Sequence, residues 1–174
     1  MSIQDKDDER KLEEEQPGPH DLESALFSKT LKDAAAIAPI VVDPATMLAE
    51  VVRLMRDNRR GCVLVASAGR LVGIFTERDV LMKIVGSPID FGRTPVSDYM
   101  TPDPDTLPAD SGVGYALNKM VVEGYRHIPL VDDQGWPTAV VSMRDLIEYV
   151  SGFYQQEVLN LPPDPRLRRS LSCL

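Results

Sequence analysis

Gly73-Ile74-Phe75-Thr76-Glu77-Arg78-Asp79-Val80 has a close counterpart 66 residues further along the chain. The counterpart is Ala139-Val140-Val141-Ser142-Met143-Arg144-Asp145-Leu146. Each run joins a short apolar stretch to a small hydroxyl residue, two spacers, an aspartate and a further apolar residue. A hydroxyl residue followed three positions later by an acid is typical of a helix start. Both runs therefore predict a strand that leads directly into a helix.

The two halves of the chain align without a gap over residues 49–86 and 115–152. Their seven identical pairs are Arg60/Arg126, Leu64/Leu130, Val65/Val131, Gly69/Gly135, Arg78/Arg144, Asp79/Asp145 and Gly86/Gly152. Because the predicted elements also follow the same order, we interpret the halves as a tandem duplication. A unit of about 55 residues is marginal alone, but two packed units can bury a substantial core. The sequence predicts an α+β (mixed α/β) fold of two β-α-β-β-α repeats related by a pseudo-twofold axis.

The expected elements follow from apolar periodicity and from turn residues. In the first repeat we expect an extended segment at 38–42, a helix capped by Asp43 with Pro44 in its first turn, strands at 62–66 and 71–75, and a helix from Thr76 or Glu77. In the second repeat we expect a helical turn at 96–100, an extended pair at 106–107, a helix capped by Ser111, strands at 127–131 and 138–141, and a final helix through 146–150.

Four parts of the chain are expected from composition. They are a flexible acidic tail at 1–20, the first repeat with a lead-in helix at 21–88, the second repeat at 89–152, and a Pro/Arg-containing tail at 153–174. Residues 1–23 carry nine acids and three bases, a net charge of −6 out of the total of −8. The folded body is therefore nearly neutral and has no broad basic face, which argues against a nucleic-acid partner.

The class of protein is narrowed further by what the sequence lacks. No apolar run approaches the roughly 18 to 20 residues that a membrane span needs. The polar start of the chain does not resemble a signal peptide. The two cysteines are Cys62, in an apolar run, and Cys173, next to the last residue. Because this spacing does not indicate a disulfide framework, we expect a cytoplasmic protein with no membrane span.

Catalysis finds little support in these residues. The only histidines are His20 and His127, and the sequence contains no nucleophile elbow, phosphate-binding lysine loop, metal-ligand spacing or dinucleotide fingerprint. Asp79 and Asp145 occupy equivalent positions, so the asymmetry of pKa values that acid–base catalysis uses is not expected. The sequence therefore favours a protein that is not an enzyme and that has no catalytic residues and no metal site.

Ligand binding fits the repeated motif better. An aspartate at a helix start can accept hydrogen bonds from the vicinal hydroxyls of a ribose. The hydroxyl of Thr76 or Ser142, together with the first free N–H groups of the helix, can hold a phosphate. The alternative is that both aspartates only stabilise their helix ends. Arg126 and His127 can bind phosphate oxygens or belong to a solvated turn, and the residues leave these two interpretations open.

The tandem Gly-x-x-Thr-x-x-Asp pattern and the segment Gly124-Tyr125-Arg126-His127-Ile128-Pro129-Leu130-Val131 resemble the CBS-domain pair, or Bateman module. The resemblance covers about residues 30–152. It implies a regulatory module that binds an adenosyl ligand between two CBS repeats and signals its occupancy to a partner. AMP, ADP or ATP is the expected ligand, and S-adenosylmethionine or NAD is the alternative. The resemblance also implies a homodimer through the CBS helices. A structural or interaction dimer without a ligand is the second hypothesis.

The resemblance also implies which residues bind the ligand. Motif residues would hold ribose and phosphate, the extended segments would line the adenine pocket, and the start of the second hairpin would complete the site. These residues are Thr76, Arg78, Asp79, Ser142, Arg144 and Asp145 of the motifs, Ile40, Val41, Thr106 and Leu107 of the extended segments, and Arg126, His127, Ile128 and Pro129 of the hairpin. The first cleft is expected to have the complete motif and the second cleft the richer cationic pair. Ala139 replaces Gly73 and is expected to crowd the second cleft.

Overall fold

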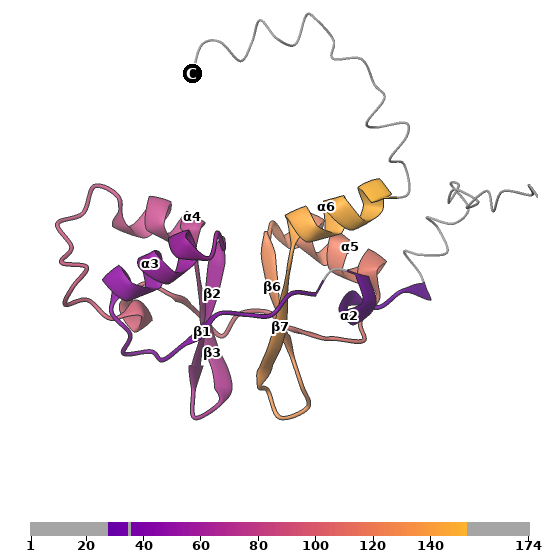
Figure 1. Ribbon diagram of the computed structural model, residues 1–174, viewed down its shortest axis with the longest axis horizontal. Coiled ribbons are helices and arrows are strands. Elements are labelled where there is room, and N and C mark those ends of the chain that lie inside the picture. Colours follow the sequence, from indigo (N-terminus) through magenta and orange to yellow (C-terminus); the bar gives the residue numbers. More distant parts are fainter. Residues whose placement is uncertain (1–27, 35, 153–174) are drawn as a thin grey trace, which may run out of the picture.

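The computed structural model describes residues 28–34 and 36–152 of the 174-residue chain. Two units lie side by side, with their β-hairpins at the centre and their helices gathered toward one end (Figure 1). The turns of both hairpins point to the opposite end. The predictions for the tails at 1–20 and 153–174, and for most of the lead-in helix, lie outside the described residues.

The first unit has a four-stranded sheet of order β1-β2-β3-β4. β1 is parallel to β2, and the other neighbouring pairs are antiparallel. Its elements are β1 (Val41–Val42), α3 (Leu48–Asp57), β2 (Cys62–Ser67), β3 (Arg70–Thr76), α4 (Glu77–Asp79), the π-helical turn η1 (Val80–Ile84), the 3-10 turn η2 (Val96–Asp98) and β4 (Thr101–Pro102).

The second unit has a three-stranded sheet of order β5-β6-β7 with the same strand directions. Its elements are β5 (Leu107–Pro108), α5 (Val113–Glu123), β6 (His127–Val131), β7 (Pro137–Ser142) and α6 (Met143–Ser151), together with the short α2 (Leu31–Ala34). The predicted β-α-β-β-α order, both hairpins and both helices that follow the repeated motif are confirmed.

Two predicted helix starts are wrong. α3 begins at Leu48 because Asp43 closes a turn of its own. The Asp43 side chain accepts a hydrogen bond from the Ala45 N–H at 2.9 Å, and its carbonyl accepts one from the Thr46 N–H at 2.9 Å. Aspartate commonly forms such turns with the backbone two residues on. In the second unit α5 begins after Gly112, and the Ser111 side chain does not cap it.

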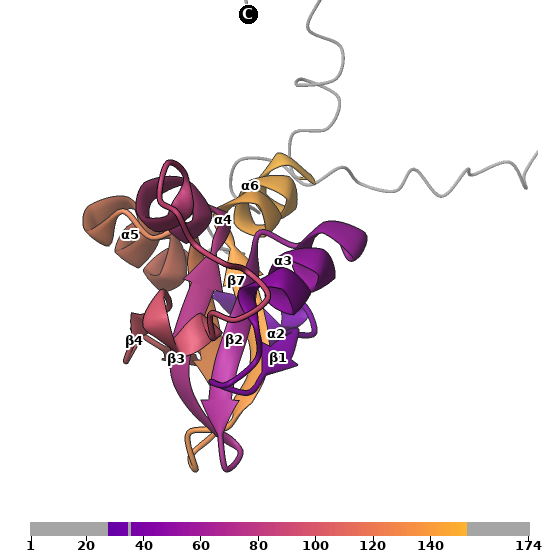
Figure 2. The same ribbon diagram turned by 90° about the vertical axis from the view of Figure 1, so that its left-hand side faces the viewer.

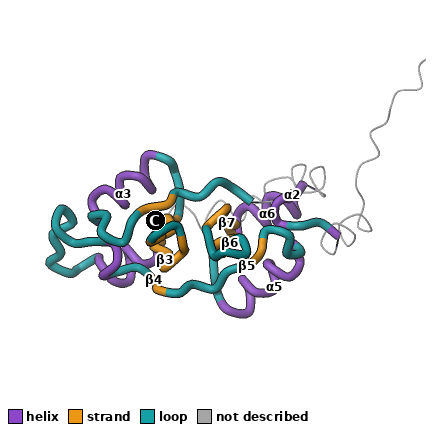
Figure 3. The backbone as a smooth tube through the Cα atoms, turned by 90° about the horizontal axis from the view of Figure 1, so that it is seen from below, coloured by secondary structure: helices purple, strands orange, loops and turns teal. Residues whose placement is uncertain are grey.

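The strands are apolar on both faces because both faces are buried. On one face Val63, Val65 and Phe75 pack with residues of α3. On the other face Leu64 and Ile74 pack with Val140 of the second unit. Figure 3 shows the two hairpins next to each other at the centre of the molecule. This burial explains why the strands read as nearly continuous apolar runs instead of alternating ones.

The lead-in segment of each unit packs against the other unit. Leu31 is fully buried in the core of the second unit, and its N–H donates to the Ser111 carbonyl at 2.9 Å. In return, Val96 is fully buried in the core of the first unit, and Pro102 pairs with Gly73 of β3. The chain from α2 to β1 therefore crosses between the units, as Figure 1 shows. This exchange ties the two units together.

No helix in the described part of the chain has the length and apolar character required to cross a membrane.

Candidate ligand-binding clefts

Both repeated motifs form capping boxes at the start of their helices. The Thr76 Oγ1 accepts a hydrogen bond from the Asp79 N–H at 3.3 Å, while Asp79 Oδ2 accepts from Thr76 N and Oγ1 at 2.8 and 2.7 Å. Ser142 and Asp145 repeat this arrangement with distances of 3.2, 2.9 and 2.6 Å. Each aspartate therefore stabilises its helix with one carboxylate oxygen, and the other oxygen is left for further contacts.

A pocket of about 360 Å³ lies between the two units. Ligand pockets commonly have volumes of roughly 300 to 1,000 Å³. The first motif, the segment around β4 and the corner before β6 supply its wall. The lining residues are Ile74, Thr76, Glu77, Arg78 and Asp79, then Thr101, Asp103, Pro104 and Asp105, and finally Gly124, Tyr125, Arg126 and His127.

The cleft is assembled crosswise from the two repeats. Arg126 and His127 face the first motif, so the expectation that this pair serves the second cleft is wrong. Arg78 also reaches across and donates to the Gly124 carbonyl at 3.2 Å. The physical reason is the pseudo-twofold arrangement of the hairpins. A Cβ at Gly61 would lie 2.9 Å from His127 Nε2, so the matching positions of the two repeats meet at the axis.

Several residues that were predicted to line an adenine pocket do not line the 360 Å³ pocket. Thr106 and Leu107 are not in the wall of this pocket, which is formed by the residues just before them. Leu107 is 5% exposed and packs in the core of the second unit, as does the fully buried Ile128. Pro129 is buried, and Ile40 packs against the core of the first unit while Val41 is 45% exposed. None of these six residues lines the 360 Å³ pocket.

Sequence reasoning missed the acidic corner of the pocket. Tyr125 donates its hydroxyl to Asp105 Oδ2 at 2.8 Å, and the Lys119 ammonium lies 3.1 Å from the same oxygen. These two partners lower the pKa of Asp105, the tyrosine bond being the larger cause. The sequence offered one signal for Tyr125, because this residue directly precedes the Arg126-His127 pair. Asp105 had none, because it lies in a connector whose path the sequence does not define.

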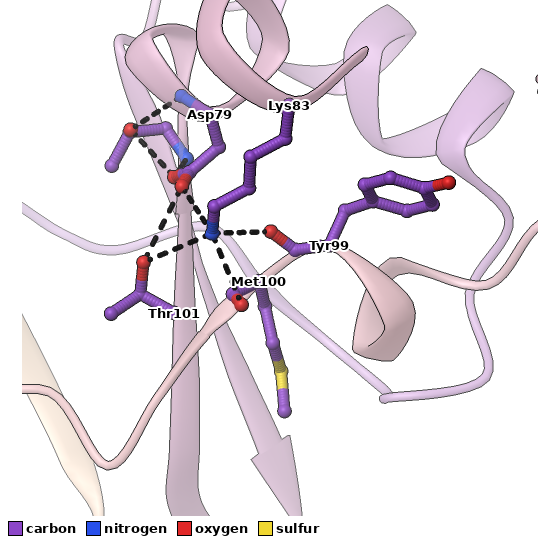
Figure 4. A network of polar contacts seen from close by, with 6 residues as sticks. Asp79, Lys83, Tyr99, Met100 and Thr101 are labelled. Carbon is purple, nitrogen blue, oxygen red and sulfur yellow. Dashed lines mark hydrogen bonds and ion pairs between the residues drawn. The ribbon is translucent and has the colours of Figure 1, made fainter. Parts of the chain in front are cut away.

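Asp79 is the best-connected polar side chain of the pocket (Figure 4). It is 7% exposed. Its Oδ1 lies 2.7 Å from the Lys83 ammonium and accepts a hydrogen bond from Thr101 Oγ1 at 3.3 Å. Lys83 also donates to the Tyr99 carbonyl at 2.8 Å. The motif helix is thereby joined to the segment that enters β4.

The model of the CBS-domain family matches residues 31–86 and 96–152 of this chain. The chain belongs to the CBS-domain family. The two matches correspond to the two repeats, and the protein is a CBS-domain pair.

Relatives of this CBS pair differ widely in length. An uncharacterised 17.7 kDa protein of Acidianus ambivalens is 37% identical over 107 residues, which are 61% of this chain and 63% of that protein. A CBS domain-containing protein of Arabidopsis thaliana is 32% identical over 106 residues, which are 60% of this chain. The match spans only 19% of the Arabidopsis protein. The chain therefore spans less than two thirds of the length of these relatives.

Solved structures share the fold of the CBS pair. The CBS-domain pair of protein MJ0100, crystallised with 5′-methylthioadenosine and S-adenosyl-L-methionine, has a TM-score of 0.64 at 21% identity. The similarity covers 71% of this chain and 97% of that one. A Methanocaldococcus jannaschii protein, described as a proposed archaeal homologue of γ-AMPK, also has a TM-score of 0.64, at 24% identity. This similarity covers 74% of this chain and 50% of the Methanocaldococcus jannaschii protein.

His127 contributes no positive charge to the cleft of the CBS pair at neutral pH. Burial lowers its pKa below the ordinary value, and the nearby acids Glu77 and Asp145 offset only part of this effect. A neutral ring can still donate one N–H. The positive charges of the cleft wall are therefore those of Arg78 and Arg126, which form no ion pair with any described residue.

The second motif of the CBS pair faces the corner before β2. Burial raises the pKa of the Cys62 thiol to about 12; Arg60 lowers this pKa by a smaller amount, and Asp145 raises it further. Arg60 and Asp145 therefore both lie near Cys62. The second motif thus faces the first repeat, just as the first motif faces the second repeat. Arg60 also borders a hollow of about 370 Å³ beside α3. Ser142, Arg144 and Asp145 do not line the 360 Å³ pocket.

The first CBS repeat has Gly73 where the second has Ala139, and this difference reflects core packing. A Cβ at Gly73 would collide with the Met100 side chain, which covers this position. In the second repeat Ile37 pairs with Val140, just as Thr101 pairs with Ile74. Ala36 thus stands in the place of Met100, and its small side chain leaves room beside β7. Ala139 therefore compensates for a smaller neighbour in the protein core.

Proposed function

We propose that this CBS pair is a regulatory module that binds an adenine nucleotide between its repeats and signals occupancy to a partner. The observation that carries the proposal is the pocket of about 360 Å³ between the units. Its wall combines the hydroxyl and N–H groups of a helix start with two arginines that have no acidic partner among the described residues. Helix starts and arginine side chains are both suited to phosphate.

The comparisons support the adenosyl part of the proposal. The CBS pair of MJ0100 was crystallised with 5′-methylthioadenosine and S-adenosyl-L-methionine, both of which contain adenosine. The proposed archaeal homologue of γ-AMPK shares the fold of this pair. Arg78 and Arg126 favour AMP, ADP or ATP over the positively charged sulfonium of S-adenosylmethionine. NAD is a further adenosyl ligand that the experiment includes.

The crosswise wall of the pocket supports a regulatory role. A ligand held by Arg78 of the first repeat and Arg126 of the second contacts both units. It therefore binds more tightly to one relative position of the units than to others, and that position becomes more populated. A partner that contacts both repeats would detect the change. This role requires no chemical step, in agreement with the lack of catalytic motifs.

The experiment is a thermal-shift screen followed by calorimetry with AMP, ATP, S-adenosylmethionine and NAD. A ligand that binds only the native state raises the melting temperature as its concentration rises above Kd. We expect AMP or ATP to give a larger shift than S-adenosylmethionine. Arg126→Gln should reduce the shift with AMP, whereas Arg93→Gln on the exposed connector should not. No shift with any of the four compounds would refute nucleotide binding.

The exposed apolar side chains of the helices support a second proposal, a homodimer. They are Leu81 (64% exposed), Met82 (74%) and Val85 (65%) in and directly after η1, Val121 (68%) and Val122 (69%) in α5, and Ile147 (55%) in α6. The helices of both units gather at the end opposite the hairpin turns (Figure 2). Large apolar side chains exposed on one end of a protein are candidates for an interface. A dimer through this face is compatible with nucleotide binding and with the structural role.

A further inference from the structure

We propose that the acidic segment Leu12-Glu13-Glu14-Glu15 of this chain docks into the hollow of about 370 Å³ beside α3. This hollow is separate from the 360 Å³ pocket, and Glu77 is the one residue that lines both. The segment precedes the residues that the structure describes. Its docking does not depend on the proposed nucleotide binding.

The hollow combines apolar side chains with an excess of positive charge. Glu77 is the one acid among its lining residues, against three arginines. The apolar side chains are buried or half-buried, whereas two of the arginines are exposed. An occupant with several carboxylates and an apolar side chain would therefore match both parts of the hollow. The lining residues are Val52, Met55 and Val80, the arginine cluster Arg56, Arg59 and Arg60, and Gly61 and Glu77.

The arginine cluster has little acidic compensation within the described part of the chain. Arg59 and Arg60 form no ion pair with any described residue. Arg56 lies 3.1 Å from Asp57, but its side chain is 75% exposed, and exposed pairs of this kind stabilise a protein little. The guanidinium groups are therefore available to carboxylates, which they can bind through two parallel hydrogen bonds.

The backbone of Arg59 is unusual for a residue that follows a helix. Its φ of 52° lies in the left-handed region, which favours glycine. At the end of α5 the left-handed residue is Gly124, with a φ of 74°. A side chain with a Cβ is strained in this region, and strained residues cluster at functional sites. The position of Arg59 is therefore consistent with a contact outside its own helix.

The arginine cluster belongs to the first repeat alone. At the offset of 66 residues, Val122 stands in place of Arg56, and Tyr125 stands in place of Arg59. Of the three arginines, only Arg60 keeps an arginine in the second repeat. The cluster is therefore not a part of the duplicated motif, and its occupant need not be the ligand of the motif.

The N-terminal segment supplies the chemistry that the hollow lacks. Residues 1–23 carry a net charge of −6, and Leu12 is followed directly by the three consecutive acids of residues 13–15. These three carboxylates match the arginine cluster in number, and the leucine matches the apolar lining. Residues 7–9 are also three consecutive acids, but two bases, Arg10 and Lys11, follow them directly. Residues 12–15 are therefore the better match.

The chain that follows the segment is long enough to reach the hollow. Residues 16–27 separate it from Ser28, the first described residue. Twelve residues span up to roughly 40 Å when they are extended. A domain of this size has a radius of gyration of about 14 Å, so its full width is within reach. A segment on the same chain also has an effective concentration in the millimolar range, so individually weak contacts are sufficient.

Carbodiimide cross-linking of the full chain tests this docking, because the reagent joins a lysine to a carboxylate only when the two are in contact. Arg59→Lys places a lysine at the hollow and keeps the charge. Arg93→Lys, on the exposed connector, is the matched control. We expect roughly tenfold more linkage to residues 13–15 in Arg59→Lys than in Arg93→Lys, because docking holds the segment near the new lysine. The yield should fall at about 1 M salt, where the Debye length is only about 3 Å.

Nuclear magnetic resonance of the ¹⁵N-labelled full chain provides a second measurement, which needs no cross-link. Arg59→Gln combined with Arg60→Gln removes two charges of the arginine cluster. The amide signals of residues 13–15 should therefore move toward their positions at high salt. Arg93→Gln removes a charge outside the hollow and should leave these signals in place.

Several results would overturn the proposal. Equal linkage in the two lysine variants, or amide signals that do not respond to the double glutamine variant, would show that the hollow takes an acidic partner from another molecule. A cross-linked product with the mass of two chains would overturn docking within one chain. Linkage mainly to residues 7–9 would overturn the choice of segment. Stronger linkage in Arg168→Lys than in Arg59→Lys would place the segment against the C-terminal arginines instead.

Discussion

His127 meets Gly61 at the axis that relates the two repeats. A Cβ on Gly61 would lie 2.9 Å from the ring, so the imidazole occupies the space that the missing side chain leaves. Burial at this interface is the main cause of the lowered pKa of His127. The charges that face it are Glu77 and Asp145, which raise the pKa, and Arg126 and Arg78, which lower it. A histidine between two units makes their packing sensitive to pH.

The first prediction concerns this histidine. Its pKa is lower in the folded state than in the unfolded state, so the unfolded state binds more protons in this range. The stabilising contribution of the neutral ring is therefore present above about pH 6.5 and is lost as the pH falls through the folded-state pKa. We expect the free energy of unfolding, measured by urea denaturation, to decrease from pH 7 to pH 5.

His127→Gln is the variant that tests this assignment. It should reduce the pH dependence between pH 7 and pH 5, because glutamine does not titrate. His127→Gln with an unchanged slope would show that another group is responsible. Asp105 does not contribute to the pH dependence between pH 7 and pH 5, because its pKa is lowered below the usual carboxylate value.

At the scale of elements, the contact between β3 and the segment entering β4 distinguishes the first unit. The Met100 side chain covers Gly73, and the Lys83 ammonium holds the neighbouring carbonyls. The π-helical turn at Val80–Ile84 carries Lys83 to this position. Such irregular turns within helices frequently occur at functional sites. The corresponding helix α6 is regular from Met143 to Ser151.

The second prediction tests the packing of these elements. Gly73→Ala should reduce the free energy of unfolding by about 1–3 kcal/mol, the usual effect of overpacking, because its Cβ collides with Met100. Met100→Ala should remove the collision. In a double-mutant cycle measured by urea denaturation, the double variant should therefore be less destabilised than the sum of the single variants. Additive effects would show that Met100 is not the obstacle.

At the scale of the whole molecule, the exchanged lead-in segments make the two units depend on each other. Leu31 lies in the core of the second unit, although it precedes the first unit in the sequence. Val96 lies in the core of the first unit, although it follows that unit's last helix. Each core is therefore completed by a segment that the family model assigns to the other repeat. We expect the pair to unfold as one cooperative body.

The third prediction follows from this exchange. Leu31→Ala should reduce the free energy of unfolding by about 2–5 kcal/mol, as expected for a fully buried leucine. Trp136 is the only tryptophan of the chain, and it packs against Gly69 of the first unit. Its fluorescence and the far-ultraviolet circular dichroism should shift to a lower midpoint together. Two separate transitions would show that the units unfold independently.

The fourth prediction concerns assembly. If the exposed apolar side chains of the helices form a homodimer interface, Leu81→Glu combined with Val121→Glu should convert a dimer to a monomer. Sedimentation equilibrium provides the molecular mass directly. Trp136→Gln changes an exposed side chain at the hairpin turn and should leave the mass unchanged. A monomeric wild type at high protein concentration would refute the dimer.

The sequence by itself determined the local features of the two repeats. A hydroxyl residue and an aspartate three positions apart produce the same capping box in both, because the hydrogen bonds join neighbouring residues. The two hairpins and the order of elements follow from apolar runs and turn residues for the same reason. The helix starts at Asp43 and Ser111 were mispredicted because either side chain can close a turn as readily as cap a helix.

Only the tertiary structure decided which segments meet across the axis. Arg126 joins the first motif, Leu31 completes the second core, and Thr101 binds Asp79, although each pair is distant in the sequence. Lys83 and Asp79 are four residues apart, a spacing that is typical of an ion pair along a helix. Only the tertiary structure adds the contacts with Thr101 and the Tyr99 carbonyl, which join this pair to the segment that enters β4. Packing around a pseudo-twofold axis determines these partners. Equivalent motifs in the two repeats can therefore acquire different partners.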